Sequence, residues 1–265
     1  MTTMDLGDVF DAGQKEFAVL GPVLWNPLGE ATVAAADPRP GDRVLDVCCG
    51  AGASAIPAAR AVGPGGHVDA IDLAERLLEQ GRADARDLPQ LDFVHADATT
   101  WPRRDYDIVQ CAYGVFFLPD MDAGADRLVS LLEPGGRFVV TTWAEEAITP
   151  VPEILEEAVV AEGGEPATNR GRGPAARINT VEKFTHWLTA RGVHDVRVVT
   201  KQHHMPLNET TAWAIVVGSA MRTRLNGVAE GILPNVRARF LDLLAAREVA
   251  QMNAVSLIGV GRTAY

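Results

Sequence analysis

The sequence predicts an α/β fold in which a seven-stranded sheet carries helices on its faces and ends in an antiparallel strand. Two observations predict this fold. Apolar, strand-like runs alternate with helix-like runs between residues 43 and 143, which is typical of a mostly parallel sheet. In addition, a glycine-containing turn joins the first apolar run to a helix, as in βαβ units that bind nucleotide-like ligands.

The first strand is predicted at residues 43–47, and it leads into the turn Cys48-Cys49-Gly50-Ala51-Gly52 and a helix over residues 54–61. Gly50 and Gly52 lie where the backbone must turn tightly beside a ligand. Asp46 precedes Gly50 by four residues. Its carboxylate suits a cationic ligand, although an acid at this place can also simply cap a turn.

The second strand is predicted at residues 67–72 and ends in Asp72, twenty residues past Gly52. A carboxylate at the tip of this strand can accept hydrogen bonds from both ribose hydroxyls. We therefore assign Asp72 and its neighbour Leu73 to cofactor binding. Asp69 is three residues earlier on the strand, away from the tip, and we expect it to be exposed.

Two ligands compete for this βαβ unit. A dinucleotide site favours a third glycine, where this chain has Ala55, and it places a pyrophosphate at the helix N-terminus. Asp46 would repel that anion but suits the ammonium of a methionine moiety. The residues thus favour S-adenosylmethionine over a nicotinamide cofactor.

Three further strands follow the βαβ unit, and they are expected at residues 91–98, 106–112 and 132–142. The carboxylate of Asp97, beside Ala98, could hold the adenine amino group. Pro134-Gly135-Gly136 forms the turn that leads into the fifth strand.

With these elements, residues 40–143 resemble the class I S-adenosylmethionine-dependent methyltransferases, especially the small-molecule branch related to the ubiquinone and menaquinone biosynthetic enzymes. The resemblance implies a Rossmann-like fold. Cys48 departs from the family pattern because it replaces the first loop glycine, so it either takes a positive φ under strain or continues the strand. The predicted cofactor-binding residues are Asp46, Cys48, Gly50, Gly52, Asp72, Leu73, Asp97, Ala98 and Cys111.

Three aromatic residues follow the fourth strand: Tyr113, Phe116 and Phe117. They predict an apolar, aromatic substrate pocket, although Phe116 and Phe117 could instead belong to the core. Methyltransferases that act on exocyclic amines of nucleobases carry an Asn- or Asp-Pro-Pro-aromatic tetrad here. This chain has Cys111-Ala112-Tyr113-Gly114 instead, which argues against that substrate class.

A phenol or alcohol acceptor needs a general base, and histidine is the usual one. We nominate His203 and His204, which follow the sixth strand. Adjacent side chains of an extended segment point in opposite directions, so only one should reach the cleft, and a surface role for both stays open. The histidines show no metal-ligand spacing, and we predict no metal.

The amino-acid composition indicates where in the cell the protein is located and which kinds of partner it binds. The net charge is −11, from 24 basic and 35 acidic residues, which argues against nucleic acid as a partner. The chain has three cysteines, no long apolar run and no secretion-type N-terminus, so we expect a cytoplasmic enzyme without disulfides or membrane spans. A small-molecule acceptor is the expected partner, and a homodimer stays open.

We divide the 265 residues into an N-terminal helical cap, 1–36, and a methyltransferase domain, 37–265, with lid insertions at about 145–178 and 205–250. The cap is broken by Gly21-Pro22 and Asn26-Pro27. The resemblance implies that it closes the cofactor cleft, although a helix that only covers the sheet stays an alternative. The turn-rich residues 162–174 are predicted to form a mobile lid. Helices are expected at 152–162, 181–190, 210–225 and 235–250, and further strands at 193–200 and 254–262.

The predicted function is S-adenosylmethionine-dependent methyl transfer to an O, N or C atom of a small hydrophobic, aromatic or secondary metabolite. Two alternatives stay open. One is a descendant of the fold that keeps the cofactor without methylating and binds or rearranges a small ligand. The other is a nicotinamide-dependent oxidoreductase.

Overall fold

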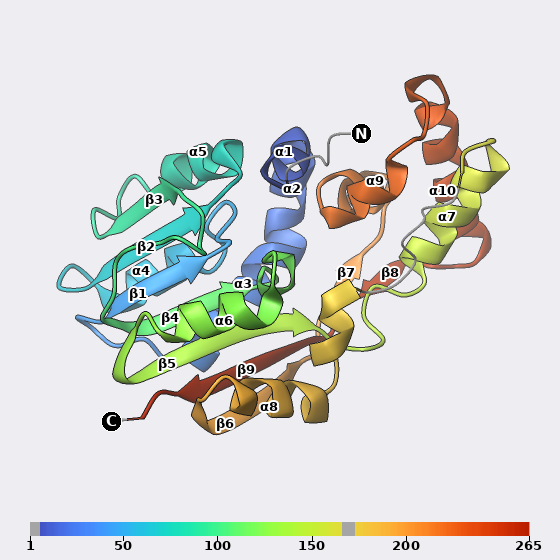
Figure 1. Cartoon of the computed structure of the whole chain (residues 1–265). Coiled ribbons are helices and arrows are strands. Elements are labelled where there is room, and N and C mark those ends of the chain that lie inside the picture. Colours follow the sequence, from blue (N-terminus) through green and yellow to red (C-terminus); the bar gives the residue numbers. More distant parts are fainter. Residues whose placement is uncertain (1–5, 166–172, 265) are drawn as a thin grey trace.

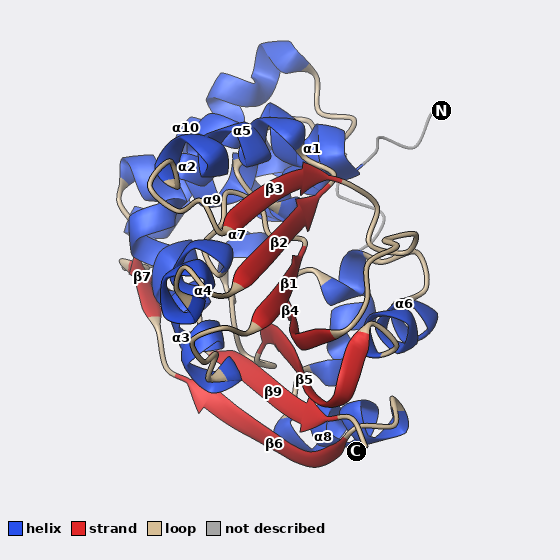
Figure 2. Cartoon of the chain, turned by 90° about the vertical axis from the view of Figure 1, so that its left-hand side faces the viewer, coloured by secondary structure: helices blue, strands red, loops and turns tan. Residues whose placement is uncertain are grey.

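The computed structural model describes residues 6–165 and 173–264 and contains a seven-stranded sheet with the strand order β3-β2-β1-β4-β5-β9-β6 (Figure 2). Its strands are β1 (Arg43–Val47), β2 (His67–Asp72), β3 (Leu91–His95), β4 (Tyr106–Ala112), β5 (Leu132–Trp143), β6 (His194–Lys201) and β9 (Ser256–Arg262). Strands β1 to β5 pair in parallel, and β9 runs antiparallel to both β5 and β6. The predicted sheet, with its antiparallel last strand, is confirmed.

Helices cover both faces of the sheet. Apolar residues of α3 (Asn26–Ala36), α4 (Ala55–Val62) and α5 (Glu75–Asp84) share one buried core with the sheet. Residues of α6 (Met121–Val129) and α8 (Val181–Ala190) share a second core with it. Strand β1 is buried from Val44 to Val47, which fits its nearly unbroken apolar sequence and its central place in a covered sheet.

The N-terminal segment is helical as predicted, but its prolines do not break it. Helix α1 (Leu6–Ala12) precedes α2 (Gln14–Leu20), which continues through the π-helical turn η1 (Gly21–Trp25) directly into α3. Pro22 and Pro27 both lie in the first two positions of their elements, where the helix changes between the α and π registers. The wider π-turn thus lets the chain stay helical.

The segment both covers the sheet and reaches the edge where the loops gather. Helix α3 contacts β4, β5 and β9, whereas α1 lies against α5 (Figure 1). A Cβ added at Gly7 in α1 would lie 2.7 Å from the carbonyl oxygen of Leu73, directly after β2. The segment therefore covers the sheet through α3, while its role in closing the cofactor cleft stays a prediction.

The later insertions differ from the sequence prediction in three places. The helix expected at 210–225 ends at Val217, and Ser219 then caps a 3-10 turn, since its side chain accepts the Met221 N–H. The helix expected to reach residue 250 ends at Ala246. A two-stranded sheet of β7 (His204–Pro206) and β8 (Gln251–Asn253) was not expected.

The other elements are α7 (Val151–Ala161), η2 (Val115–Phe117), η3 (Gly173–Ile178), α9 (Glu209–Val217), η4 (Ala220–Leu225), η5 (Glu230–Ile232) and α10 (Leu233–Ala246).

A third apolar core joins the N-terminal segment to these insertions. Leu20, Leu24 and Leu28 are buried together with apolar residues of α7, α9 and α10. Helices α2 and α9 approach closely, because a Cβ at Gly13 would lie 2.3 Å from the carbonyl oxygen of Val217. Residues 166–172 of the predicted mobile lid lie outside the described residues.

In the described ranges, no helix combines the length and the apolar character that a membrane crossing requires.

Candidate functional site

The candidate site lies at the carboxyl ends of β1, β2 and β4. Strand β1 pairs with β2 on one side and with β4 on the other, so the strand order reverses between β1 and β4. Open α/β sheets bind ligands in the crevice at such a switch point. The loop from Cys48 to Gly52 and the turn at Tyr113 both begin here.

The loop after β1 has the backbone that its glycines predict. The φ angles are +54° at Gly50 and +89° at Gly52, a region that side chains rarely adopt. A Cβ at Gly50 would lie 3.1 Å from Cζ of Phe17, and one at Gly52 would lie 2.7 Å from Cζ of Phe93. Cys48 has φ +56°, so it takes the left-handed conformation and does not continue the strand.

Asp72 is bound to the backbone of this loop. One carboxylate oxygen accepts the Gly50 N–H over 2.8 Å, and the other accepts the Ala74 N–H over 2.8 Å. Burial raises the pKa of Asp72, while these backbone donors lower it. Each oxygen keeps a second lone pair, so the carboxylate is held in place with acceptor capacity to spare. Leu73, beside it, is exposed.

Asp46 is fully buried on β1. Its Oδ2 accepts a hydrogen bond of 2.7 Å from the hydroxyl of Ser54 and one of 3.1 Å from the amide Nε2 of Gln110. Burial raises the pKa of Asp46 to about 7, against the lowering effect of these two donors. In the described part of the chain, Oδ1 of Asp46 and Oε1 of Gln110 have no hydrogen-bond partner. Sequence reasoning missed Gln110, although a polar residue inside an apolar strand was a usable signal.

Asp97 and Ala98 lie just beyond the end of β3, which stops at His95. Asp97 is exposed, and its Oδ1 accepts hydrogen bonds of 2.8 Å from both the N–H and the hydroxyl of Thr99. Ala98 is buried in the core between the sheet and α6. The structure therefore places Asp97 in a tight turn just after the carboxyl end of β3, and its contact with the adenine stays a prediction.

Cys111 is a buried free thiol at the end of β4, near Cys48. A Cβ at Gly114 would lie 2.3 Å from Cβ of Cys48 and 3.0 Å from Sγ of Cys111. Interaction with Cys111 and burial both raise the pKa of the Cys48 thiol. The turn after β4 is thus in direct contact with the loop after β1.

The three predicted substrate residues belong to a larger aromatic cluster. Tyr113, Phe116 and Phe117 are half-buried, and Tyr113 donates its hydroxyl hydrogen bond to Ser256 over 2.5 Å. Burial raises the pKa of Tyr113. The aromatic cluster consists of Phe10, Phe17, Trp25, Tyr113, Phe116, Phe117 and Trp143.

This cluster connects the N-terminal segment to the ends of β4 and β5. Phe17 stacks on Trp25 at 5.4 Å between ring centroids, and Trp25 lies 5.9 Å from Tyr113. Tyr113 in turn lies 4.3 Å from Trp143. The sequence did not identify the other four members as site residues: Phe10, Phe17, Trp25 and Trp143. The aromatic residues among the first 25 positions were a usable signal for three of them.

The two nominated histidines have different surroundings. His203 is half-buried, and its Nε2 lies 2.8 Å from the carbonyl oxygen of Val23 in η1. A carbonyl only accepts, so this nitrogen carries the proton. His204 is exposed and pairs with Asn253 in the small sheet. The structure thus joins His203, but not His204, to the segment that carries Trp25.

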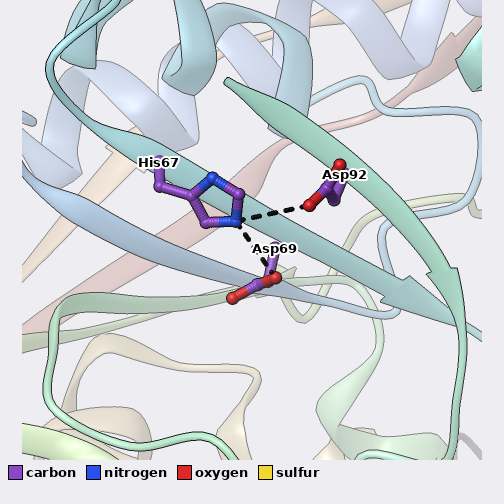
Figure 3. Close-up of side chains that lie close together, drawn as sticks. All are labelled: His67, Asp69 and Asp92. Carbon is purple, nitrogen blue, oxygen red and sulfur yellow. Dashed lines mark hydrogen bonds and ion pairs between the residues drawn. The ribbon is translucent and has the colours of Figure 1, made fainter. Parts of the chain in front are cut away.

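A second titratable cluster lies towards the amino ends of β2 and β3, away from the candidate site. There His67 contacts Asp69 at 3.3 Å and Asp92 at 3.6 Å (Figure 3). The expectation that Asp69 is exposed is wrong, because its side chain is fully buried. Asp69 also pairs with Arg103 and accepts the Tyr106 hydroxyl over 2.6 Å. With its oxygens already bound to these donors, Asp69 has a structural role in this network.

The sheet topology, the glycine loop after β1 and the acid at the tip of β2 are typical of a nucleotide-binding α/β domain. Residues 44–136 match the model of a family described as a methyltransferase domain. This region of the chain is therefore similar to that methyltransferase domain, and curated relatives of the chain are named as methyltransferases.

Two relatives show the extent of the sequence similarity. Aklanonic acid methyltransferase DauC of a Streptomyces species is 37% identical over 137 residues, which cover 50% of this chain and 62% of that one. Demethylmenaquinone methyltransferase of Clavibacter sepedonicus is 34% identical over 152 residues, 57% of this chain and 58% of that one. The chain therefore spans less than two thirds of the length of these relatives.

The structural similarity to solved proteins covers more of the chain than the sequence similarity does. The crystal structure of the [4+2]-cyclase SpnF aligns with 98% of this chain, and the alignment covers 96% of SpnF, with a TM-score of 0.60 and 17% sequence identity. At this identity, the similarity shows a shared fold.

Proposed function

We propose that this protein transfers the methyl group of S-adenosylmethionine to an O, N or C atom of a small, hydrophobic, aromatic acceptor. The observation that carries this proposal is the aromatic cluster beside the glycine loop. Phe17 lies on Gly50, and the rings continue through Trp25 to Tyr113 after β4. Half-buried aromatic walls next to a methyl-donor site suit a planar, apolar acceptor.

The residues of the loop fit the cofactor chemically. The unpartnered Oδ1 of buried Asp46 is an acceptor that suits the ammonium of the methionine part. Asp72, held by two backbone N–H groups, has acceptor capacity for the ribose hydroxyls. Gly50 and Gly52 leave the backbone bare of side chains where the ligand must approach. Leu73 and Asp97 are exposed just after β2 and β3, and we assign them, with Ala98 beside Asp97, to the adenosine part of the cofactor.

The bound cofactor supplies a sulfonium that already activates the methyl group. The chain therefore has to align the acceptor in line with that group and to exclude water. We assign alignment to Tyr113, Phe116 and Phe117, with Trp25 and Trp143 from the same cluster. His203 is the preferred general base, since it is half-buried beside η1, whereas His204 is exposed.

Methyl transfer from isotopically labelled S-adenosylmethionine to a panel of phenols, hydroxyquinones and aromatic amines tests this proposal. We expect incorporation into at least one aromatic acceptor, and we expect Trp25→Ala to lower kcat/KM more than Trp213→Ala. Trp213 is a matched control because it packs against Phe240 in the insertion. Cofactor binding without methylation of any acceptor would favour the non-methylating alternative, and tight binding of NADH instead would favour the oxidoreductase.

We extend the proposal to the partners and the cellular location of the enzyme. The acidic net charge of −11 supports a small-molecule acceptor in place of nucleic acid, and it fits a cytoplasmic enzyme. A homodimer is testable by light scattering on the purified chain.

A further inference from the structure

The buried pair of Asp46 and Gln110 has an unusual arrangement of acceptors. The two side chains meet through the Nε2 to Oδ2 hydrogen bond of 3.1 Å, from neighbouring strands at paired positions. Both residues are fully buried, and each presents one further oxygen without a partner in the described chain. Buried acceptors without donors destabilise the folded protein, because each oxygen has lost its hydrogen bonds to water.

A proton on Asp46 would supply the hydrogen-bond donor that the two unpartnered oxygens, Asp46 Oδ1 and Gln110 Oε1, lack. Protonated Oδ1 becomes a donor, and the acceptor that Gln110 offers is Oε1. A hydrogen bond from this donor to Oε1 would add to the existing Nε2 to Oδ2 bond and form a ring of two hydrogen bonds between a carboxylic acid and a carboxamide. The ionised form leaves both oxygens unpaired.

The charges around the pair also favour the neutral acid. Asp72 lies near enough to disfavour a second negative charge, and the Cys49 thiol also interacts with Asp46. The contact from the turn before α4 is the neutral hydroxyl of Ser54, and that from β4 is the neutral amide of Gln110. In residues 6–165 and 173–264, no ion pair includes Asp46.

We propose that Asp46 is a neutral acid paired with Gln110 in the free protein, and that binding of the cofactor ammonium displaces this proton to solvent. The inference rests on the proposed role of Asp46 in cofactor binding. The ammonium would donate to Asp46 Oδ1 and Gln110 Oε1, taking over the place of the proton. Gln110 is thus a positioning residue that fixes the protonation state of Asp46, and cofactor affinity becomes dependent on pH.

The size of the pH dependence of cofactor affinity follows from the link between binding and loss of the Asp46 proton. Burial raises the pKa of Asp46 to about 7. Binding that requires the ionised form should then weaken by about tenfold between about pH 8 and about pH 6. Most of one proton should be released per binding event at about pH 6, and very little at about pH 8.

Titration calorimetry with S-adenosylhomocysteine, in buffers of different ionisation enthalpy, measures the released protons. This probe carries the same ammonium group. Asp46→Asn is the matched variant, because its amide can pair with Gln110 as the neutral acid would, but it cannot titrate. We expect proton release and pH-dependent affinity in the natural protein, and weaker, pH-independent binding without proton release in Asp46→Asn. Proton release that persists in Asp46→Asn, or binding by the natural protein without proton release at about pH 6, would overturn the proposal.

A second measurement needs no ligand. The carboxyl 13C signal of Asp46, assigned by its loss in Asp46→Asn, should titrate near pH 7 in the free protein. A midpoint in the ordinary range near 3.8 would overturn the inference. Failure of S-adenosylhomocysteine to bind at any pH would instead contradict the proposed function, so the two failures are distinguishable.

Discussion

Gly50 donates its backbone N–H to the carboxylate of Asp72 over 2.8 Å, across 22 residues of sequence. This bond joins the loop after β1 to the tip of β2. The same carboxylate also accepts the Ala74 N–H, which lies directly before α5. The residue predicted to bind the ribose is therefore oriented by backbone groups, a form of preorganisation that lowers the cost of ligand binding.

Asp69 should be a stability residue and not a ligand residue. Asp69→Ala removes the partner of the Tyr106 hydroxyl and of Arg103 inside the protein. We expect it to lower the free energy of unfolding by about 2–3 kcal/mol. Affinity for S-adenosylhomocysteine should be unchanged at temperatures where the variant is folded. Urea denaturation measures the first effect, and the exposed Asp92→Ala serves as the control. Equal stability of the two variants would contradict the buried network.

Helix α3 should depend on Gly29 for its contact with the glycine loop. A Cβ at this position would lie 2.2 Å from the carbonyl oxygen of Ala53, so Gly29→Ala must push the helix away. We expect a loss of about 1–3 kcal/mol in the free energy of unfolding. Gly65→Ala is a matched control, since a Cβ there meets nothing within 4 Å. If both variants have the same urea midpoint, the close packing of α3 on the loop is incorrect.

Cys48 carries backbone strain, because its φ is +56°. Glycine adopts this conformation readily, whereas alanine keeps the strain and also loses the sulfur. Cys48→Gly should therefore be more stable than Cys48→Ala, by about 1 kcal/mol. Thermal denaturation of the two variants side by side measures the difference. A more stable alanine variant would show that the left-handed conformation is not strained.

The buried carboxyl of Asp46 should also make stability depend on pH. Its folded pKa of about 7 is raised above the ordinary 3.8, so its contribution is fully present below about pH 4 and is lost as the pH rises through about 7. Between about pH 5 and pH 8 this loss amounts to about 2–3 kcal/mol. Asp46→Asn should remove that part of the pH dependence. Denaturant titrations at the two pH values test it, and an unchanged pH dependence in the variant would count against an elevated pKa.

Local patterns predicted the sheet well because its strands are short apolar runs separated by glycine and proline turns. The same patterns could not place Asp69. Whether an acid inside a strand is exposed depends on Tyr106 and Arg103, which are distant in sequence. Helix α9 stopped early because Gly218 packs against the backbone of α2, a tertiary contact. Strands β7 and β8 have three residues each, too few for a recognisable alternation.

The site was predictable in part for the same reason. Its glycines and acids lie at strand ends that periodicity locates, whereas the aromatic cluster gathers residues from α1, α2, η1, β5 and the turn after β4. Only the folded chain shows that Phe17 lies on Gly50, or that Trp25 lies between Phe17 and Tyr113. Gln110 became a site residue only through its pairing with Asp46.

Calorimetric titration of S-adenosylhomocysteine into Asp72→Ala tests the central claim most directly, because this carboxylate is proposed to accept two charge-assisted hydrogen bonds from the ribose. Each such bond contributes about 1.5–3 kcal/mol before desolvation, and a water molecule can replace part of it. Compared with the natural protein, we expect Asp72→Ala to bind about tenfold to several hundredfold more weakly while remaining folded. Asp87→Ala, at an exposed acid after α5, should bind as the natural protein does. Asp72→Ala with unchanged affinity, or Asp87→Ala with an equal loss, would contradict the account.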